Sequence, residues 1–270
     1  MTGDGVRDLN DFVCVVTGAS RGAGRGIAIE LGNRGAEIYV TGRTTRSASG
    51  DARGSLSETA ELVRANGGVC IPVRCDHTVD DDIAALFDRV RHDQGRLDVL
   101  VNNAWGGYEE RGESASSFFD TPFWEQPLWR WEAMFTAGVR ASFVTSRYGA
   151  PLLVENRGER PGLIVNTIAW AFGAYLGNVL YDTAKAATAR MAFGMAQELR
   201  AHRVASVALA LGHLGVSETP RYGGRAIAAL ARDPEVLAKS GEVLTPGDLA
   251  REYGFTDVDG TQPEPFALPA

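Results

Sequence analysis

The chain has 270 residues and a formal net charge of −7, and 44% of its residues are hydrophobic. This length suits one large α/β domain with a full core. The acidic balance argues against nucleic acids and anionic membranes as partners, because basic surfaces bind both. The sequence has no apolar run of membrane-spanning length, and residues 1–12 lack the apolar core of a secretory signal. We therefore expect a cytoplasmic protein that acts on a small molecule.

Strand-length apolar runs alternate with helix-length amphipathic stretches along the chain. Strands are expected at residues 12–17, 37–41, 69–74, 97–102, 163–168 and 204–209, and helices at 22–33, 55–66, 80–92, 127–154 and 181–201. Ser55 and Asp80 are the expected N-caps of two of these helices. The cysteines lie in or beside strands, which predicts buried thiols at Cys14, Cys70 and Cys75. The alternation predicts an α/β fold of one domain over residues 1–270, with a doubly wound parallel sheet and helices on both faces.

Two stretches interrupt this rhythm. Residues 104–126 form an insert rich in aromatic side chains, and residues 212–245 form a second long connection rich in Gly, Ala and Arg. Long connections inside a compact domain usually serve as lids or binding loops, so we expect 212–245 to be a substrate loop. The core is then expected over about 10–245, and the tail 246–270 is expected to be loosely ordered after Asp259.

A glycine-rich turn, Thr17-Gly18-Ala19-Ser20-Arg21-Gly22-Ala23-Gly24, joins the first strand to the first helix. Gly18 allows a tight turn, while Gly22 and Gly24 let the backbone approach a pyrophosphate and the helix pack closely on the sheet. The helix N-terminus offers N–H groups and partial positive charge to the phosphates. Because the turn lies between a strand and a helix, it predicts a dinucleotide site.

The end of the second strand indicates which dinucleotide binds. An NAD site would place a carboxylate there, whereas this chain has Gly42-Arg43. Arg21 and Arg43 together favour NADP(H) over NAD(H), because two guanidinium groups suit a 2′-phosphate. The alternative is that both are ordinary surface charges. Asp76, after the third strand, either accepts a hydrogen bond from the adenine amino group or caps a turn.

Tyr181 and Lys185 are four residues apart on an expected helix and share one face. An ordinary tyrosine titrates near pH 10, which is too high for efficient proton transfer at neutral pH. A neighbouring ammonium stabilises the phenolate and lowers that pKa. Alone, such a pair is usually just part of a helix surface. Beside a nucleotide turn, it predicts a catalytic proton donor and its partner.

Three motifs occur in register: Thr17-Gly18-x-x-x-Gly22-x-Gly24, Asn102-Asn103-Ala104 and Tyr181-x-x-x-Lys185. Over about residues 10–245 the chain resembles the short-chain dehydrogenase/reductases, and segments 231–234, 240–244 and 248–260 resemble one branch of that family. The resemblance implies a Rossmann-type fold with strand order 3-2-1-4-5-6-7, NAD(P)-dependent carbonyl reduction or alcohol oxidation, and a homodimer or homotetramer. It implies catalysis by Tyr181 and Lys185. The expected cofactor contacts are Gly18, Ser20, Arg21, Gly22, Ala23, Gly24, Arg43, Asp76, Asn102, Ala104, Tyr181, Lys185 and Gly212.

The chain departs from this family at two places. The family's serine after the fifth strand is replaced by Ala169, and its asparagine in the long helix is replaced by Gly138, which cannot hold the water that an amide would position for Lys185. Loss of one oxyanion donor typically costs about 100- to 1000-fold in rate. Thr167 shares the face of Ala169 but lies one residue pair deeper. Candidate substitutes, each of which is otherwise a packing, capping or solvated residue, are Trp170, Tyr175, Asn178 and His213.

All five tryptophans fall between Trp105 and Trp170, in segments above the carboxyl ends of the strands. These aromatic side chains suit a bulky apolar substrate, although they could equally dock the insert or form a subunit contact. The sequence therefore predicts an NADP(H)-dependent oxidoreductase that reduces a carbonyl or an imine. Two alternatives stay open because Ala169 and Gly138 favour both: a non-redox cyclase or dehydratase on this scaffold, and a catalytically silent NADPH sensor.

Overall fold

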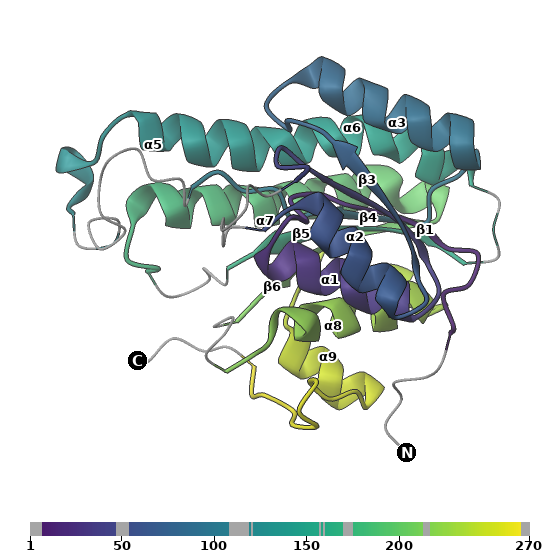
Figure 1. Cartoon of the computed structure of the whole chain (residues 1–270). Helices are drawn as coiled ribbons and strands as arrows, with labels where there is room; N and C mark the ends of the chain where they lie inside the picture. The colour runs from purple at the N-terminus through teal and green to yellow at the C-terminus, as the bar shows by residue number, and fades with distance from the viewer. Residues whose placement is uncertain are drawn as a thin grey trace.

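The computed structural model describes residues 7–46, 54–107, 119, 121–156, 158, 160–169, 175–212 and 217–265. In these residues one sheet of seven parallel strands has the order β3-β2-β1-β4-β5-β6-β7 (Figure 1). The strands are β1 Val13–Val16, β2 Glu37–Gly42, β3 Val69–Arg74, β4 Val99–Asn102, β5 Gly162–Ile168, β6 Val204–Ala210 and β7 Val243–Leu244. The predicted parallel, doubly wound sheet and its strand order are confirmed. The order reverses between β1 and β4, the position at which such sheets bind ligands.

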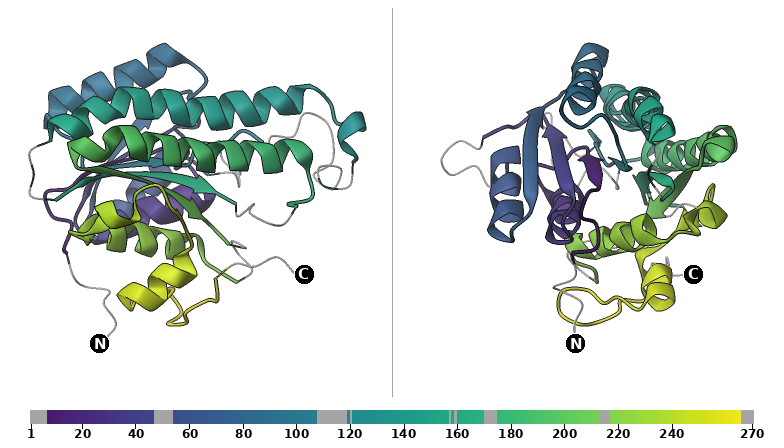
Figure 2. Two further views of the ribbon diagram at one scale, coloured as in Figure 1. Left: turned by 180° about the vertical axis from the view of Figure 1, so that it is seen from behind. Right: turned by 90° about the vertical axis from the view of Figure 1, so that its right-hand side faces the viewer.

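Helices cover both faces of the sheet (Figure 2). One face carries α1 (Gly22–Asn33), α2 (Leu56–Ala65) and α8 (Pro220–Arg232), with α9 (Pro246–Tyr253) beyond them. The other carries α3 (Asp80–Gln94), α6 (Ala141–Glu155) and α7 (Val179–Leu199). Shorter elements are η1 (Phe123–Glu125), α5 (Trp129–Trp131), η2 (Glu132–Arg140), η3 (Arg200–His202) and η4 (Val236–Lys239).

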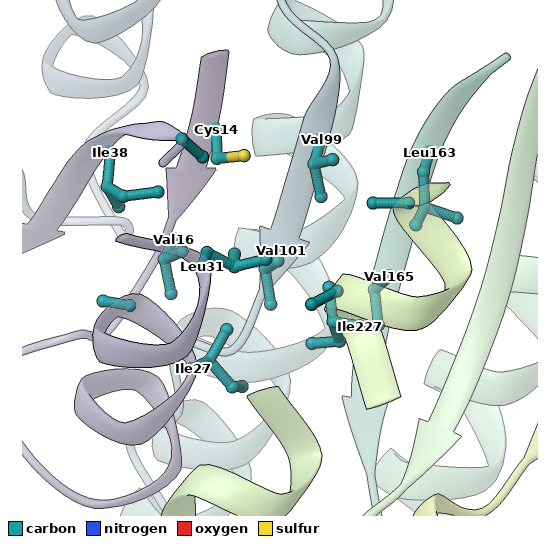
Figure 3. Packing of buried hydrophobic residues seen from close by; sticks show 14 of the residues in the cluster. Cys14, Val16, Ile27, Leu31, Ile38, Val99, Val101, Leu163, Val165 and Ile227 are labelled. Carbon is teal, nitrogen blue, oxygen red and sulfur yellow. The ribbon is translucent and has the colours of Figure 1, made fainter. Parts of the chain in front are cut away.

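The core is built by strands that are buried on both faces. Alternate residues of β1, β4 and β5 point towards α1 and α8, where Val16, Val101 and Val165 meet Ile27 and Ile227 (Figure 3). The residues between them point to the opposite face, towards α3 and α6. This period of two lets each strand fill two apolar layers, as parallel sheets with helices on both sides require.

The segment 212–245 differs from its expectation as a long loop, because it contains α8. Thr219 caps this helix by accepting a hydrogen bond from the Arg221 N–H, and Pro220 stands in its first turn. A Cβ on Gly224 would lie 2.8 Å from the Cβ of Glu30, so α8 and α1 approach closely. The glycines that suggested a loop are therefore packing residues, and the Thr-Pro start was the signal for a helix.

The tail also differs from its expectation. Gln262 donates to the carbonyl oxygens of Ala250 and Phe255, at 3.0 and 2.8 Å. Asp257 accepts from both the N–H and the hydroxyl of Thr219, at 2.7 and 2.6 Å. These bonds hold the described part of the tail, up to residue 265, against α8 and α9.

The local expectations have mixed outcomes. Ser55 caps α2 by accepting from the Glu58 N–H at 3.3 Å, as predicted. Val79, and not Asp80, is the cap residue of α3; Asp80 opens the helix, and its carboxylate pairs with Arg140 at 2.7 Å. The three cysteines are free and buried, as predicted. None of the described helices has the length and apolar character needed to cross a bilayer.

His77 is a buried polar residue that connects a strand to a helix. Its Nε2 lies 2.7 Å from Oγ1 of Thr41, and its Nδ1 lies 3.1 Å from Oγ1 of Thr145, so the ring joins β2 to α6. Burial lowers the pKa of His77 from 6.5 to about 4. The unfolded chain therefore binds more protons than the fold between about pH 6.5 and 4, and the free energy of unfolding falls as the pH drops through that window.

We predict that His77→Gln removes part of this acid sensitivity. In the parent protein the histidine contributes a slope of up to about 1.4 kcal/mol per pH unit between pH 6.5 and 4. Urea unfolding from pH 7 to 4 measures it, with His92→Gln, at an exposed position, as the control for the loss of a histidine. Equal slopes in the parent and His77→Gln would contradict the assignment.

Candidate active site

The glycine-rich turn leaves the end of β1 at the reversal point of the sheet. Gly18 and Gly22 have φ of 63° and 55°, in the left-handed region that favours glycine. A Cβ on Gly18 would lie 2.8 Å from Cα of Ala104, and one on Gly24 would lie 2.5 Å from Nδ2 of Asn103. A Cβ on Gly22 would meet no described atom within 4 Å. Gly18 and Gly24 therefore permit close packing, while the space beside Gly22 is open.

Thr17 and Asn103 join this turn to the segment after β4. The hydroxyl oxygen of Thr17 accepts from the N–H groups of Asn103 and Ala104, at 2.8 and 2.9 Å. The Asn103 amide donates to the carbonyl oxygens of Thr17 and Gly18, at 2.9 and 3.2 Å. Sequence reasoning gave neither residue a role of its own. The signal was their position inside two motifs that meet at the same sheet edge.

The start of α1 suits an anion. Arg21 is the N-cap residue with an extended backbone, and within the described chain its side chain makes no capping hydrogen bond. The N–H groups of the first turn are thus available to a phosphate. Ser20 lies in the same turn and accepts from Arg25 through its carbonyl oxygen, at 2.6 Å. Ala23 is half-buried in the first turn of the helix.

Arg43 and Asp76 lie at the ends of the neighbouring strands β2 and β3. Asp76 accepts from the N–H and the hydroxyl of Thr78, at 3.0 and 2.7 Å, so it caps a turn. Partial burial would raise the pKa of Asp76, but these bonds and the charges of Arg43 and His77 outweigh it and leave the pKa lowered. Arg21 and Arg43 are both exposed. An open helix start, a glycine-rich turn and two exposed guanidinium groups fit a phosphorylated dinucleotide.

Asn102 faces the interior rather than this open space. Its side chain is 2% exposed and donates to Oγ of Ser146 and to Oδ1 of Asn166, at 2.8 and 3.0 Å. It therefore ties the end of β4 to α6 and β5. Ala104 is half-buried beside the glycine-rich turn.

Tyr181 and Lys185 lie together at the start of α7. Both side chains are buried, and Nζ of Lys185 lies 5.5 Å from the centre of the Tyr181 ring. Asn178 fixes this helix start, because its Oδ1 accepts from the Tyr181 N–H at 3.0 Å. Burial lowers the pKa of Lys185 to about 7. The predicted pair is thus brought together in a buried setting.

Trp105, two residues after Asn103, contacts both members of the pair. Nζ of Lys185 lies 3.8 Å from the centre of the indole, over its face. The rings of Trp105 and Tyr181 meet edge to face, with centres 5.5 Å apart and planes at 89°. Phe119 approaches Tyr181 from the insert in the same way, at 6.1 Å. Sequence reasoning expected Trp105 to line the substrate pocket and did not anticipate its contact with Lys185.

The two departures from the family lie beside the same pair. Ala169 follows β5 and packs in an apolar cluster that includes Tyr181 and Met134. Gly138 lies in η2, a π-helical stretch of the long helix that was expected to be continuous over 127–154. A Cβ on Gly138 would lie 2.6 Å from two ring carbons of Trp105. The hydroxyl of Thr167 donates to the carbonyl oxygen of Asn102 at 3.3 Å, one level below.

The candidate substitute donors are spread over different surroundings. Asn178 is buried as the cap of α7, whereas Tyr175 is 61% exposed. Trp170 and His213 lie outside the described residues, as does most of the insert. Gly212, after β6, donates through its N–H to Oε2 of Glu218 at 3.1 Å. Sequence reasoning missed this buried carboxylate, whose pKa is raised by burial.

Known proteins share these features. The family model described as short chain dehydrogenase matches residues 12–221. Dehydrogenase/reductase SDR family member 1 of Homo sapiens is 38% identical, over 93% of this chain and 85% of that protein. Its counterpart in Mus musculus is 37% identical, over 94% and 86%. The branch expected from the C-terminal segments is that of these proteins, and it is confirmed.

Solved structures agree with this result. A metagenomic short-chain oxidoreductase in complex with NADP matches with a TM-score of 0.72 and 29% identity, over 88% of this chain and 99% of that one. A dehydrogenase from Xanthomonas campestris shares the fold, with a TM-score of 0.80 and 22% identity over 97% and 99%. The chain belongs to the short-chain dehydrogenase family.

Proposed function

We propose that this protein is an NADP(H)-dependent oxidoreductase that reduces a carbonyl or an imine on a bulky apolar small molecule. The observation that carries the proposal is the buried Tyr181–Lys185 pair, which lies at the same sheet edge as an open glycine-rich turn. A relative of 29% identity has been solved with NADP, which supports the choice of cofactor. We also expect a cytoplasmic homodimer or homotetramer.

The proposed chemistry assigns Tyr181 as the acid. A bound dinucleotide would supply the hydride that the substrate carbon accepts. Negative charge then develops on the substrate oxygen, and the phenol hydroxyl of Tyr181 donates the proton that neutralises it. The ammonium of Lys185 stabilises the phenolate that remains, because an opposite charge nearby favours the charged form. Burial of both groups strengthens this interaction, since the effective dielectric constant is lower than in water.

The proposed cofactor contacts follow the sheet edge. The glycine-rich turn, with Ser20 and Ala23, and the start of α1 hold the pyrophosphate. Arg21 and Arg43 hold the 2′-phosphate. Asp76 accepts from the adenine amino group through the carboxylate lone pairs that Thr78 does not use. Ribose contacts fall to the segment after β4 and to Lys185. The complete proposed set of contacts is Gly18, Ser20, Arg21, Gly22, Ala23, Gly24, Arg43, Asp76, Ala104, Tyr181, Lys185 and Gly212, whereas the expected contact of Asn102 is not retained because its buried amide bonds to Ser146 and Asn166.

The proposed substrate surface is apolar. Trp105, Phe119 and Ala169 surround Tyr181, and none of them carries a charge. We assign the remaining walls to Trp170, Tyr175, Asn178 and His213. An aromatic or branched carbonyl compound would bury apolar area against such walls, whereas a charged substrate would lose hydration without a partner.

We predict that Tyr181→Phe lowers turnover by about 100- to 10,000-fold, because the proton donor is removed. NADPH should still bind, because only the hydroxyl group is lost. NADPH oxidation over a panel of aryl and alkyl ketones measures turnover, and fluorescence titration measures binding. Lys185→Met should lower both turnover and NADPH affinity.

Other outcomes of this assay favour the alternatives. Product formation without NADPH consumption, lost in Tyr181→Phe, would point to a cyclase or dehydratase. Tight NADPH binding with no product from any substrate would point to a sensor. Full turnover in Tyr181→Phe would contradict the assigned acid.

We predict that Arg43→Asp shifts preference from NADPH towards NADH by about 10- to 100-fold, the range expected for losing one charge-assisted hydrogen bond. The ratio of kcat/KM for the two cofactors measures the shift. Arg46→Asp, an exposed arginine three residues further along, is the matched control. An unchanged ratio in Arg43→Asp would exclude its contact with the 2′-phosphate.

We predict that Ala169→Ser raises kcat by up to about 100-fold, because it restores a hydroxyl donor next to Tyr181 where charge develops in the transition state. Pre-steady-state NADPH oxidation separates this chemical step from product release. Ala169→Cys, of similar size but with a weak donor, is the control. If kcat does not rise in the serine variant, another group already provides this hydrogen bond.

A further inference from the structure

We propose that the indole of Trp105 positions the ammonium group of Lys185, and that this indole occupies the room that Gly138 leaves where the family pattern has an asparagine. This role matters for catalysis only if Lys185 acts as described under the proposed function. The contact itself can be tested without turnover.

The contact has the geometry of a cation–π interaction. Nζ of Lys185 lies 3.8 Å from the centre of the indole and over its face. Trp is the best aromatic acceptor for a cation, and the interaction is strongest where water is excluded. Lys185 is 8% exposed, so the indole replaces hydration that the buried ammonium has lost.

The position of the indole depends on missing side chains. A Cβ on Gly138 would lie 2.6 Å from two of its ring carbons, and a Cβ on Gly107 would lie 2.6 Å from its Nε1. A Cβ on Gly106 would lie 2.7 Å from Cβ of Ala137 in the same π-helical stretch. Any side chain at position 138 would displace the ring. Gly138 and Trp105 therefore act together: the asparagine of the family pattern is absent at position 138, and the indole of Trp105 fills the space.

Three charged groups of the described elements that pack around Lys185 have partners elsewhere. On η2, Glu132 accepts from Thr136, and Arg140 pairs with Asp80. On α7, Asp182 accepts from the Leu176 N–H. Among the described residues, burial alone accounts for the lowered pKa of Lys185, and Tyr181 is the titratable side chain of its own helix that faces it. The ammonium of Lys185 thus contacts the π face of the indole.

The first test titrates Lys185 in the folded protein without cofactor. With a folded pKa near 7 and an ordinary value of 10.5, the unfolded chain binds the proton more tightly, and the lysine makes stability rise with pH above about 7. Urea unfolding from pH 5 to 10.5 is measured for each protein and for its Lys185→Met partner. The onset pH, at which the two free energies of unfolding begin to diverge, reports the pKa of Lys185 in the folded protein.

We expect Trp105→Leu to move this onset down by about one pH unit, because the ammonium loses the π face while apolar volume is largely kept. Trp105→Phe keeps a ring and should move the onset less than Trp105→Leu. The same onset in the parent protein and Trp105→Leu would overturn the proposal, whatever the outcome of the turnover assays. Conversely, a shifted onset in a protein without turnover would sustain the contact and refute the proposed function.

The second test probes this joint action of Gly138 and Trp105. Gly138→Asn should lower the unfolding temperature by about 3–10 °C, because its side chain overlaps the indole. In a protein that already carries Trp105→Ala, Gly138→Asn should lower the unfolding temperature by less. The double variant should also bind NADPH more tightly than Trp105→Ala alone. Gly194→Asn, at a helical glycine whose Cβ would meet no described atom within 4 Å, controls for the general cost of Asn in a helix. Additive effects of the two substitutions would overturn this joint action.

Discussion

The seam between the ends of β1 and β4 is the constraint on which the rest of the site depends. One hydroxyl, that of Thr17, accepts from two successive N–H groups of the neighbouring segment, and the Asn103 amide returns two bonds to the glycine-rich turn. These bonds satisfy backbone groups at a place where parallel strands diverge and the ladder ends. The same segment then continues by two residues to Trp105. The hydrogen bonds between these two segments therefore fix both the open glycine-rich turn and the position of the Trp105 ring against Lys185.

Lys185 illustrates how a buried charge is accommodated at this edge. Taking an ammonium out of water costs several kcal/mol, and the group normally responds by losing its proton. Within the described chain, burial is the cause of its lowered pKa, and no carboxylate contributes. An indole face is a weaker partner than a carboxylate, and burial lowers the pKa of the lysine to about 7. Such a lysine responds strongly to any further charge that enters the site.

The sequence predicted the parallel sheet and most element bounds, because the apolar periodicity and the turn chemistry are local, whereas the strand order followed from the resemblance to the family. It also predicted that Tyr181 and Lys185 share a helix face. It did not predict α8, where Gly224 looks like a loop residue until α1 is placed against it. Nor could it predict that Trp105 meets Lys185, since 80 positions separate them and only the seam at Thr17 brings them together. The roles of Gly138 and Asn103 likewise depend on contacts between distant segments.

Ala169 and Gly138 can be understood as parts of one environment rather than as two separate losses. Ala169 adds to an apolar cluster around Tyr181, and Gly138 admits an aromatic ring into the same region. Removing two hydrogen-bonding side chains lowers the local polarity, and a lower effective dielectric constant strengthens the remaining interaction between a phenolate and an ammonium. A serine and an asparagine stabilise charge by direct hydrogen bonds. Under the proposed function, this site would rely instead on the phenolate–ammonium pair that forms during the reaction and on an aromatic face, and it would favour apolar substrates over polar ones.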